Sequence, residues 1–68
     1  MSETPMELIR KLDKAAAELL ALARHVRESA PEVTDAELRQ EMLESAEELE
    51  RRAQEMADAI QKLRVKIN

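Results

Sequence analysis

The sequence predicts an all-α fold, a helical hairpin of two antiparallel helices that assembles into a four-helix bundle. The 68-residue chain contains no glycine, cysteine or aromatic residue, and it consists mainly of the strongest helix formers. Apolar residues recur at intervals of three and four over two long stretches, which is typical of amphipathic helices. One internal proline separates these stretches. We therefore expect one domain, residues 1–68, with helices over 5–29 and 35–67 and a loop over 30–34.

The first helix has a clear start and stop. Thr4 provides an N-cap hydroxyl, a proline follows at the first helical position, and Glu7 lies three residues after the cap, which together form a helix-start signature. At the other end, Ala30 precedes Pro31, and a residue before proline is disfavoured in the helical region. The first helix should therefore end at Ser29.

The second helix should begin with a capping box. Thr34 is followed three residues later by Glu37, the spacing in which each side chain bonds the other's backbone amide. Val33 and Leu38 occupy the positions of a hydrophobic staple around this cap. Along both helices, four acid–base pairs at i,i+4 spacing are Glu7/Lys11, Glu47/Arg51, Glu48/Arg52 and Asp58/Lys62.

Both helices carry an apolar seam in which small and large residues alternate. In heptad notation the a positions are largely alanine and the d positions are leucine, methionine or valine, which favours close, interdigitated helix packing. We predict that this seam forms the oligomer interface, with Leu19, Leu49 and Met56 at its centre. Its residues are Ile9, Leu12, Ala16, Leu19, Ala23, Val26, Met42, Ala46, Leu49, Ala53, Met56, Ile60, Leu63 and Ile67.

Further apolar residues widen each seam, so that each helix can touch two neighbours as in a bundle. A chain of about 60 residues buries only roughly 60% of its unfolded surface, and a two-helix hairpin less. The sequence therefore predicts a homo-oligomer, with a dimer favoured, six helices also permitted, and the partner's orientation open. The flanking residues are Met6, Leu8, Ala15, Leu20 and Leu22, then Leu38, Leu43, Ala57 and Ala59.

The two expected helices differ in length by roughly 12 Å at 1.5 Å per residue. If Ser29 lies opposite Asp35, then Pro5 lies opposite Ala59, and residues 60–67 have no partner within the chain. Because the seam continues through this segment, we expect it to pack against a second chain, near loop residues 31–33 of an antiparallel copy.

The layering of small and large residues resembles that of the Rop family, whose helical hairpins dimerise into four-helix bundles. The resemblance covers most of the chain but concerns pattern only. Rop-type proteins bind paired RNA loops through a basic face with an aromatic residue, and this chain has neither, so that activity is not carried over. The layers that carry the resemblance are Ala16/Leu19, Ala46/Leu49 and Ala53/Met56.

The doubled capping signals, the charge-matched helix ends and the absence of glycine and aromatics also resemble de novo designed helical-hairpin oligomers. The loop departs from that pattern, because an idealised design often places glycine there. The segment 29–33 is more similar to a natural bacterial connector. A natural small interaction protein therefore remains the alternative origin.

Charge and composition argue against several partners. The net charge of −4, with both signs mixed along the chain and no aromatic residue, is unlike a nucleic-acid-binding surface. No segment approaches the roughly 20 apolar residues of a membrane span. Residues 1–5 show neither the basic nor the apolar region of an export signal. We expect a cytoplasmic protein without a nucleic-acid, membrane or small-molecule partner.

Two features are candidate ion sites. His25, the only histidine, has Glu18 seven residues earlier on the same helix face, and symmetry copies would have to complete a metal shell or pH switch around them. We expect His25 to lie at the surface instead, with no metal or cofactor bound. An acidic block, which could attract a basic partner or calcium but which we expect to be a solvated outer face, contains Glu41, Glu44, Glu47, Glu48 and Glu50.

Catalysis has little basis in the sequence. Ser29 lies four residues after His25, but a serine–histidine pair at a helix end, without a pocket or oxyanion donors, does not make an active site. We therefore expect no enzymatic activity and predict a structural self-assembly module. The alternative is a natural small bacterial adaptor or chaperone-like hairpin that binds a helix of another protein.

Overall fold

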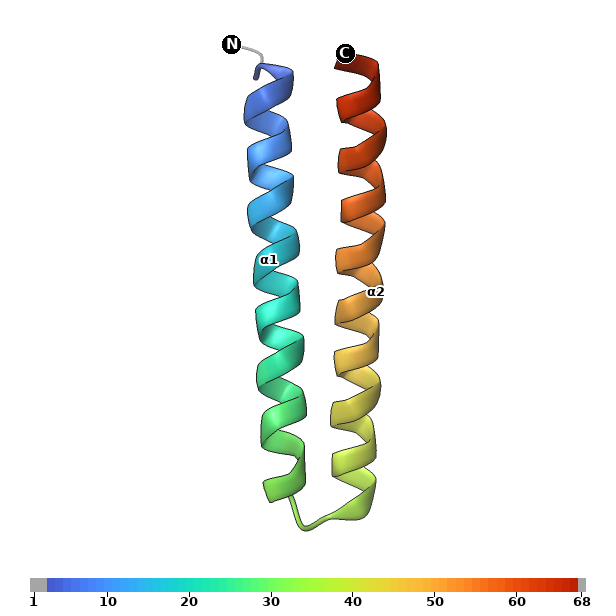
Figure 1. Cartoon of the computed structure of the whole chain (residues 1–68). Helices are drawn as coiled ribbons and strands as arrows, with labels where there is room; N and C mark the ends of the chain where they lie inside the picture. Colours follow the sequence, from blue (N-terminus) through green and yellow to red (C-terminus); the bar gives the residue numbers. More distant parts are fainter. Residues whose placement is uncertain (1–2, 68) are drawn as a thin grey trace.

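The computed structural model describes residues 3–67 and is an all-α hairpin, as expected. Helix α1 (Pro5–Ser29) is followed by a short 3₁₀ helix, η1 (Ala30–Glu32), and by helix α2 (Ala36–Ile67). The two long helices run antiparallel and pack along their whole lengths (Figure 1). The described residues exclude Met1, Ser2 and Asn68. Met1 and Ser2 belong to the segment that was expected to lack an export signal.

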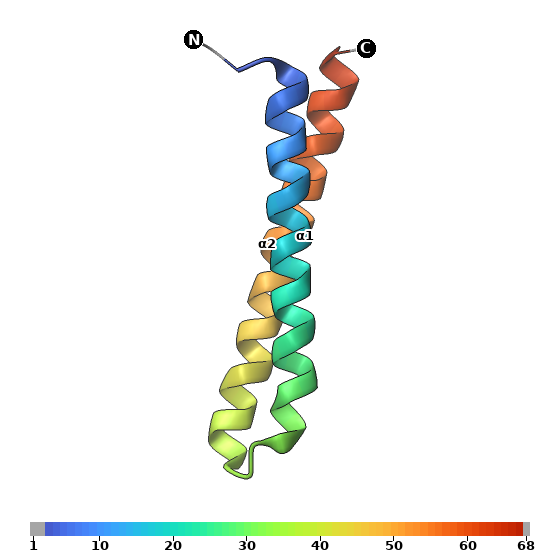
Figure 2. The same cartoon turned by 90° about the vertical axis from the view of Figure 1, so that its left-hand side faces the viewer.

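The hairpin is a thin rod with principal dimensions of 49 × 19 × 16 Å. The helices cross at a shallow angle, so that α2 lies on one side of α1 near the loop and on the other side near the chain ends (Figure 2). The first turn of α1 and the last turn of α2 lie at the same end of the rod (Figure 1). Each helix therefore has its partner on one side and solvent on the others.

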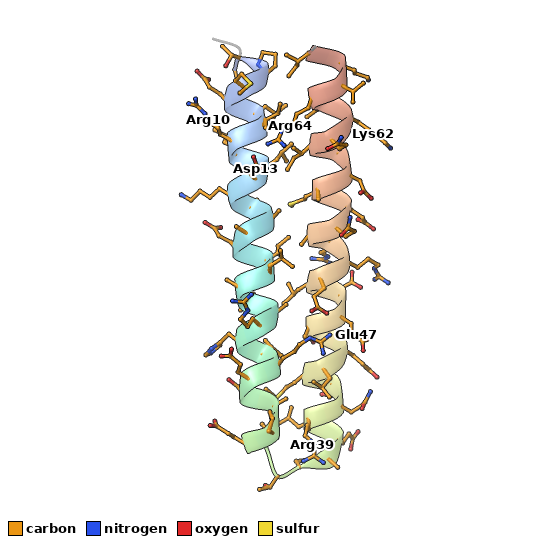
Figure 3. All side chains as sticks on the ribbon, in the orientation of Figure 1. Arg10, Asp13, Arg39, Glu47, Lys62 and Arg64 are labelled. Atoms are coloured by element: carbon orange, nitrogen blue, oxygen red, sulfur yellow. The ribbon has the colours of Figure 1, made fainter. Side chains whose placement is uncertain are left out.

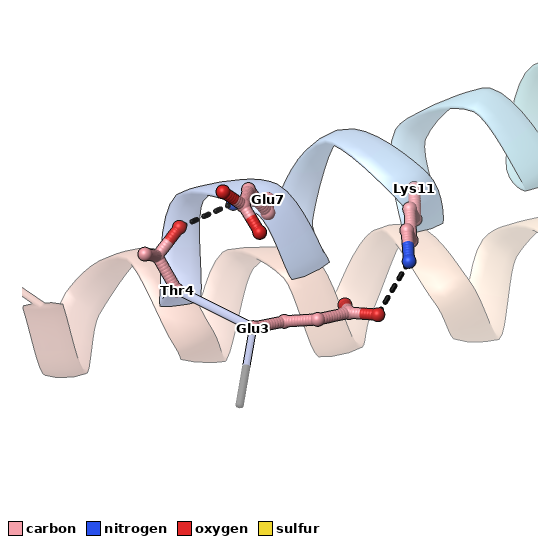
Figure 4. Close-up of polar contacts among 4 residues, drawn as sticks. All are labelled: Glu3, Thr4, Glu7 and Lys11. Atoms are coloured by element: carbon pink, nitrogen blue, oxygen red, sulfur yellow. Dashed lines mark hydrogen bonds and ion pairs between the residues drawn. The ribbon is translucent and has the colours of Figure 1, made fainter. Parts of the chain in front are cut away.

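The start of α1 has the predicted cap. Thr4 is extended, with φ −71° and ψ 154°, and its Oγ1 accepts a hydrogen bond of 3.2 Å from the backbone N–H of Glu7 (Figure 4). The carbonyl oxygen of Thr4 accepts from the N–H of Leu8 at 3.1 Å. The carboxylate of Glu3 extends forward along the helix and pairs with Lys11 (Figure 4). The predicted first helical residue is thus confirmed.

The end of α1 differs from the prediction at Ala30, which was expected to leave the helical region. Its φ of −55° and ψ of −41° are helical, and its N–H donates to the carbonyl of Val26. Pro31 lies in the first turn of η1, where a missing N–H breaks no helical bond. Ala30 is only 1% exposed, and this burial offsets the pre-proline preference. The chain turns into an extended conformation only at Val33.

The cap of α2 is Asp35, whereas the sequence predicted Thr34. Oδ1 of Asp35 accepts hydrogen bonds from the N–H groups of Glu37 at 2.9 Å and Leu38 at 3.2 Å. A carboxylate at this position also interacts favourably with the positive end of the helix dipole. The helix therefore begins at Ala36, one residue later than predicted.

The loop is held by an arginine that the sequence analysis did not identify. Nη1 of Arg39 donates a hydrogen bond of 3.0 Å to the carbonyl oxygen of Val33. Leu38, the expected partner of Val33 in a hydrophobic staple, remains 47% exposed. A hydrogen bond from Arg39 therefore connects the start of α2 to the loop, where an apolar contact between Val33 and Leu38 was expected.

The prediction that residues 60–67 lack an intramolecular partner was wrong. Because η1 continues α1 by three residues at a rise of about 2.0 Å each, the first arm reaches about 43 Å against about 48 Å for α2. Ile60 is only 5% exposed within its own chain, and Arg64 bonds Asp13 of α1. The proposed contact between this segment and a partner's loop is therefore not needed to cover Ile60.

The core of the hairpin is narrow. Four of its six buried residues are alanine, which lets the helix backbones approach closely. Among residues 3–67, no large side chain is less than 2% exposed. The buried residues are Ile9, Ala23, Ala30, Ala46, Ala53 and Ile60.

Candidate interaction surface

The predicted seam lies largely between the two helices of one chain. Five of its residues belong to the buried core, and Ile67 at the end of α2 is 44% exposed. The remaining eight, which include all seven d-position residues of the seam, are half-buried: Leu12, Ala16, Leu19, Val26, Met42, Leu49, Met56 and Leu63. The seam is therefore first an intramolecular interface, and its role between chains stays a prediction.

Large aliphatic side chains outside the core remain strongly exposed. Most of them are the flanking residues that widen the seams, and they occupy both long sides of the rod. They are Met6 (53% exposed), Leu8 (41%), Leu20 (51%), Leu22 (50%), Leu38 (47%), Val65 (68%) and Ile67 (44%). The hairpin thus presents apolar surface along its length.

One long side of the rod is crossed by two ion pairs that join α1 to α2. Nε and Nη2 of Arg27 bond the two carboxylate oxygens of Glu50 at 3.1 and 2.5 Å. Nη2 of Arg64 lies 3.3 Å from Oδ2 of Asp13, and the two side chains point toward each other between the helices (Figure 3). We call this side the bridged face; it also carries Leu20.

The spacing of these pairs sets the register of the hairpin. Asp13 and Arg27 are fourteen residues apart on α1, and Glu50 and Arg64 are fourteen apart on α2. All four occupy heptad position e, and e positions face each other across an antiparallel pair of helices. The sequence contained this signal, but the register needed to pair the residues depends on the path of η1.

Each partner stabilises the charge of the other in the Arg27–Glu50 pair. The hydrogen bond from Arg27 lowers the pKa of Glu50 below its usual value, and burial opposes this only in part. The hydrogen bond and the charge of Glu50 raise the pKa of Arg27. Both side chains are over 40% exposed, so the pair orients the helices more than it stabilises them.

The opposite long side is more apolar. Leu8 and Leu22 of α1 and Leu38 of α2 occupy heptad position g, on the other side of the seam from the e positions. Ala15 and Ala59 share the same columns. We call these five apolar residues the leucine face; the g column of α2 also contains Ser45, Arg52 and Lys66. Within residues 3–67, the ion pairs that connect the two helices lie on the bridged face.

The candidate metal residues lie on the outer surface. Both His25 and Glu18 are exposed on α1. No group of three or more histidine, cysteine, aspartate or glutamate side chains in the described part of the chain is arranged to hold a metal ion. Ser29, the serine near His25, is half-buried at the end of α1.

The acidic block is partly neutralised. Glu50 pairs with Arg27 across the hairpin, and Glu48 pairs with both Arg51 and Arg52. The other three glutamates are exposed, and Glu47 points away from α1 (Figure 3). A shallow depression on α2, on the side of its g column, is lined by Glu41, Glu44, Ser45, Glu48, Leu49 and Arg52.

The predicted pairs along the helices form only in part. Arg52 and Glu48 lie 3.3 Å apart, as predicted. Lys11 pairs with Glu3 and Arg51 with Glu48, each replacing the expected partner. Asp58, expected to pair with Lys62, instead accepts a 3.2 Å hydrogen bond from the side-chain amide of Gln54. An exposed charged side chain on a helix thus has several possible partners with similar interaction energies.

Comparison of the chain with family models, with curated proteins and with solved structures finds no match. The resemblances to Rop layering and to designed hairpins stay expectations. In the region that the structure describes, neither helix has an apolar stretch long enough to cross a bilayer.

Proposed function

We propose that this chain is a structural self-assembly module that forms a homo-oligomer, with a dimer of hairpins, and thus a four-helix bundle, as the preferred state. The observation that carries the proposal is the contrast between core and surface. Among residues 3–67, the single chain buries six residues, four of them alanine, while seven large aliphatic side chains remain 41–68% exposed.

The energetics of a lone hairpin support the proposal. Full burial of a large aliphatic side chain contributes about 1.5–3 kcal/mol, whereas alanine contributes much less. Leu19, Leu49 and Met56 are only half-buried in the single chain. For scaffolds of this size without disulfide or metal, apolar burial and chain entropy nearly cancel. A second hairpin would add apolar burial without lengthening the chain.

The proposal does not depend on residues 60–67 being unpartnered, since Ile60 is buried within its own chain. It rests on the exposed rows beside the seam and on the half-buried d positions. No catalytic or cofactor-binding residue takes part in it.

The first test is the mass of the purified chain in solution. Sedimentation equilibrium over a concentration series should give twice the 7.8 kDa of one chain. A cooperatively folding species of one chain mass at all concentrations would contradict the proposal. A poorly helical monomer that folds only with a different protein would favour the adaptor alternative.

The second test is a charge in the seam. Leu49→Asp places a carboxylate at a half-buried d position, and we expect it to abolish association and to melt both helices together. Ala17→Asp adds the same group at an exposed site on α1 and should leave the oligomer intact. A Leu49→Asp chain that is monomeric yet fully helical would show that folding does not require a second copy.

A further inference from the structure

The charges of the hairpin are segregated along the rod. The half nearest the loop, residues 18–50, contains ten acidic and three basic side chains, a formal charge of −7. The half nearest the chain ends, residues 1–17 and 51–68, contains five acidic and eight basic side chains, a formal charge of +3. Moving the boundary by one residue in each arm keeps both signs. One end of the rod is therefore acidic and the other basic.

The dimensions of the rod restrict how two copies can meet. A stable interface buries about 800 Å² of each partner. One long side, 49 × 19 Å, offers roughly this area. An end, 19 × 16 Å, offers only about a third of it. Copies must therefore associate lengthwise.

For lengthwise contact, the charge segregation selects the orientation. Two copies with both loops at the same end would place their acidic halves, each with a formal charge of −7, beside each other. Copies that run in opposite directions would place the acidic half of each beside the basic half of the other, which is electrostatic complementarity of the kind that sets orientation at interfaces. A two-fold axis perpendicular to the rod produces this arrangement and uses the same surface on both partners.

The two long sides differ in their suitability for burial. Covering the bridged face would desolvate four charged side chains, those of Asp13, Arg27, Glu50 and Arg64, a penalty that often exceeds the gain from the pair. The leucine face has no charged residue in the g column of α1, and Leu8, Leu22 and Leu38 on it are 41–50% exposed. In the g column of α2 it has two, Arg52 and Lys66, so fewer charged side chains would be covered there than on the bridged face.

We propose that the leucine face is the docking site for a second copy of this chain, which lies lengthwise and antiparallel on it. This deepens the proposed function and rests on self-association being real. The charges beside the leucine face match this orientation. Glu18, Glu41 and Glu48 flank it near the loop, and Lys11 and Lys62 flank it near the chain ends. Arg52 and Lys66 lie in the g column of α2 in the basic half, and Glu55 is the acidic exception there. In the antiparallel pair, each acidic flank meets the partner's basic flank.

The face is tested with two leucines that form a matched pair. Leu22 on the leucine face is 50% exposed, and Leu20 on the bridged face is 51% exposed. Two residues apart on a helix, they project about 160° from each other. Leu22→Glu should weaken the dimer at least about tenfold, whereas Leu20→Glu should change its Kd less than about threefold. Equal weakening, or a larger effect of Leu20→Glu, would overturn the choice of face.

The orientation is tested by the distance between spin labels. The chain has no cysteine, so Glu32→Cys gives a unique label at the exposed loop end. In the antiparallel pair the two labels should be separated by nearly the 49 Å length of the rod. A separation near its 19 Å width would mean a parallel pair and would overturn the proposal.

A label at Ala17→Cys, near the middle of the rod, separates failure of the orientation from failure of self-association. Its distance to the partner label should be similar in either orientation, because both are lengthwise and residue 17 lies near the middle of the rod. If neither variant shows dipolar coupling between labels, and sedimentation gives one chain mass, then the proposed function itself fails. Dipolar coupling at Ala17→Cys together with a close pair at Glu32→Cys leaves self-association standing and rejects only the antiparallel arrangement.

Discussion

At the scale of single residues, Asp35 does more than the other loop residues to define where α2 begins. One carboxylate oxygen accepts from two backbone N–H groups, those of Glu37 and Leu38, and the carbonyl of Asp35 accepts from the N–H of Arg39 at 2.9 Å. The two side-chain bonds satisfy amides that would otherwise lack an intrahelical partner. The side chain of Asp35 therefore stabilises the first turn of α2.

We expect Asp35→Ala to lower the free energy of unfolding by about 1 kcal/mol. The matched control is Thr34→Ala, which removes the residue that the sequence pattern predicted as the cap and should change stability by less than about 0.5 kcal/mol. Urea unfolding followed by circular dichroism measures both. The reverse order of effects would mean that Thr34, and not Asp35, caps α2 in solution.

The Arg27–Glu50 pair predicts a pH dependence at the acid side. The pKa of Glu50 is lowered in the folded chain, so its stabilising effect is present above the ordinary carboxylate pKa and is lost as pH falls through the lowered value. The raised pKa of Arg27 has a stabilising effect that is present below the ordinary guanidinium pKa and is lost only as pH rises through the raised value.

Glu50→Gln should therefore lower the urea midpoint near neutral pH, and the difference from the parent chain should shrink as pH falls below the ordinary carboxylate range. Glu55→Gln removes an exposed glutamate from the outer surface of the same helix and corrects for the loss of one charge. If the Glu50→Gln difference stays constant across this range, the pair does not exist in solution.

At the scale of the helices, buried alanines set the distance between α1 and α2. Ala46 is fully buried and Ala53 is 3% exposed. Because the neighbouring backbone fills the space that a larger side chain would need, these positions have no room for added methylene groups.

Ala46→Leu should destabilise the hairpin by about 1–3 kcal/mol through overpacking. Ala17→Leu makes the same change at an exposed position of α1, and we expect an effect within about 0.5 kcal/mol. Thermal unfolding of the two variants gives the comparison. Equal stability of the two variants would show that the helices are farther apart than the structure indicates.

The helices themselves were predictable, but their register was not. Thr4 and the spacing of the apolar residues placed α1 correctly, because caps and periodicity are local. The path of the chain from Ala30 to Val33 depends on how well Ala30 packs, which local preference does not encode. A three-residue extension of the first arm changed the partners of Ile60 and Arg64, and with them the expected intermolecular contact.

The sequence predicts which apolar residues make up the candidate surface, but it does not predict which long side of the rod is better suited to burial. The flanking leucines follow from heptad position, and they were identified. That Leu20 lies between two ion pairs while Leu22 does not depends on which e positions meet across the hairpin. The pairing required the register, so the two long sides could not be ranked from the sequence.

At the scale of the whole molecule, self-association makes stability depend on protein concentration. Any species that binds the folded state raises the melting temperature in proportion to the logarithm of its concentration. We expect the melting temperature to rise by several degrees when the chain concentration increases from about 2 to about 200 µM. Circular dichroism at the two concentrations measures this. A constant melting temperature would contradict an obligate oligomer.

The opposed charges at the two ends of the rod also make the hairpin an electric dipole. The dipoles of two antiparallel helices largely cancel within one chain, so side-chain charge dominates the moment along the long axis. A single hairpin would therefore rotate into alignment in an applied field, whereas two hairpins related by a perpendicular two-fold axis would have no net moment along their length. Assembly would therefore remove the particle's dipole along its long axis while doubling its net charge.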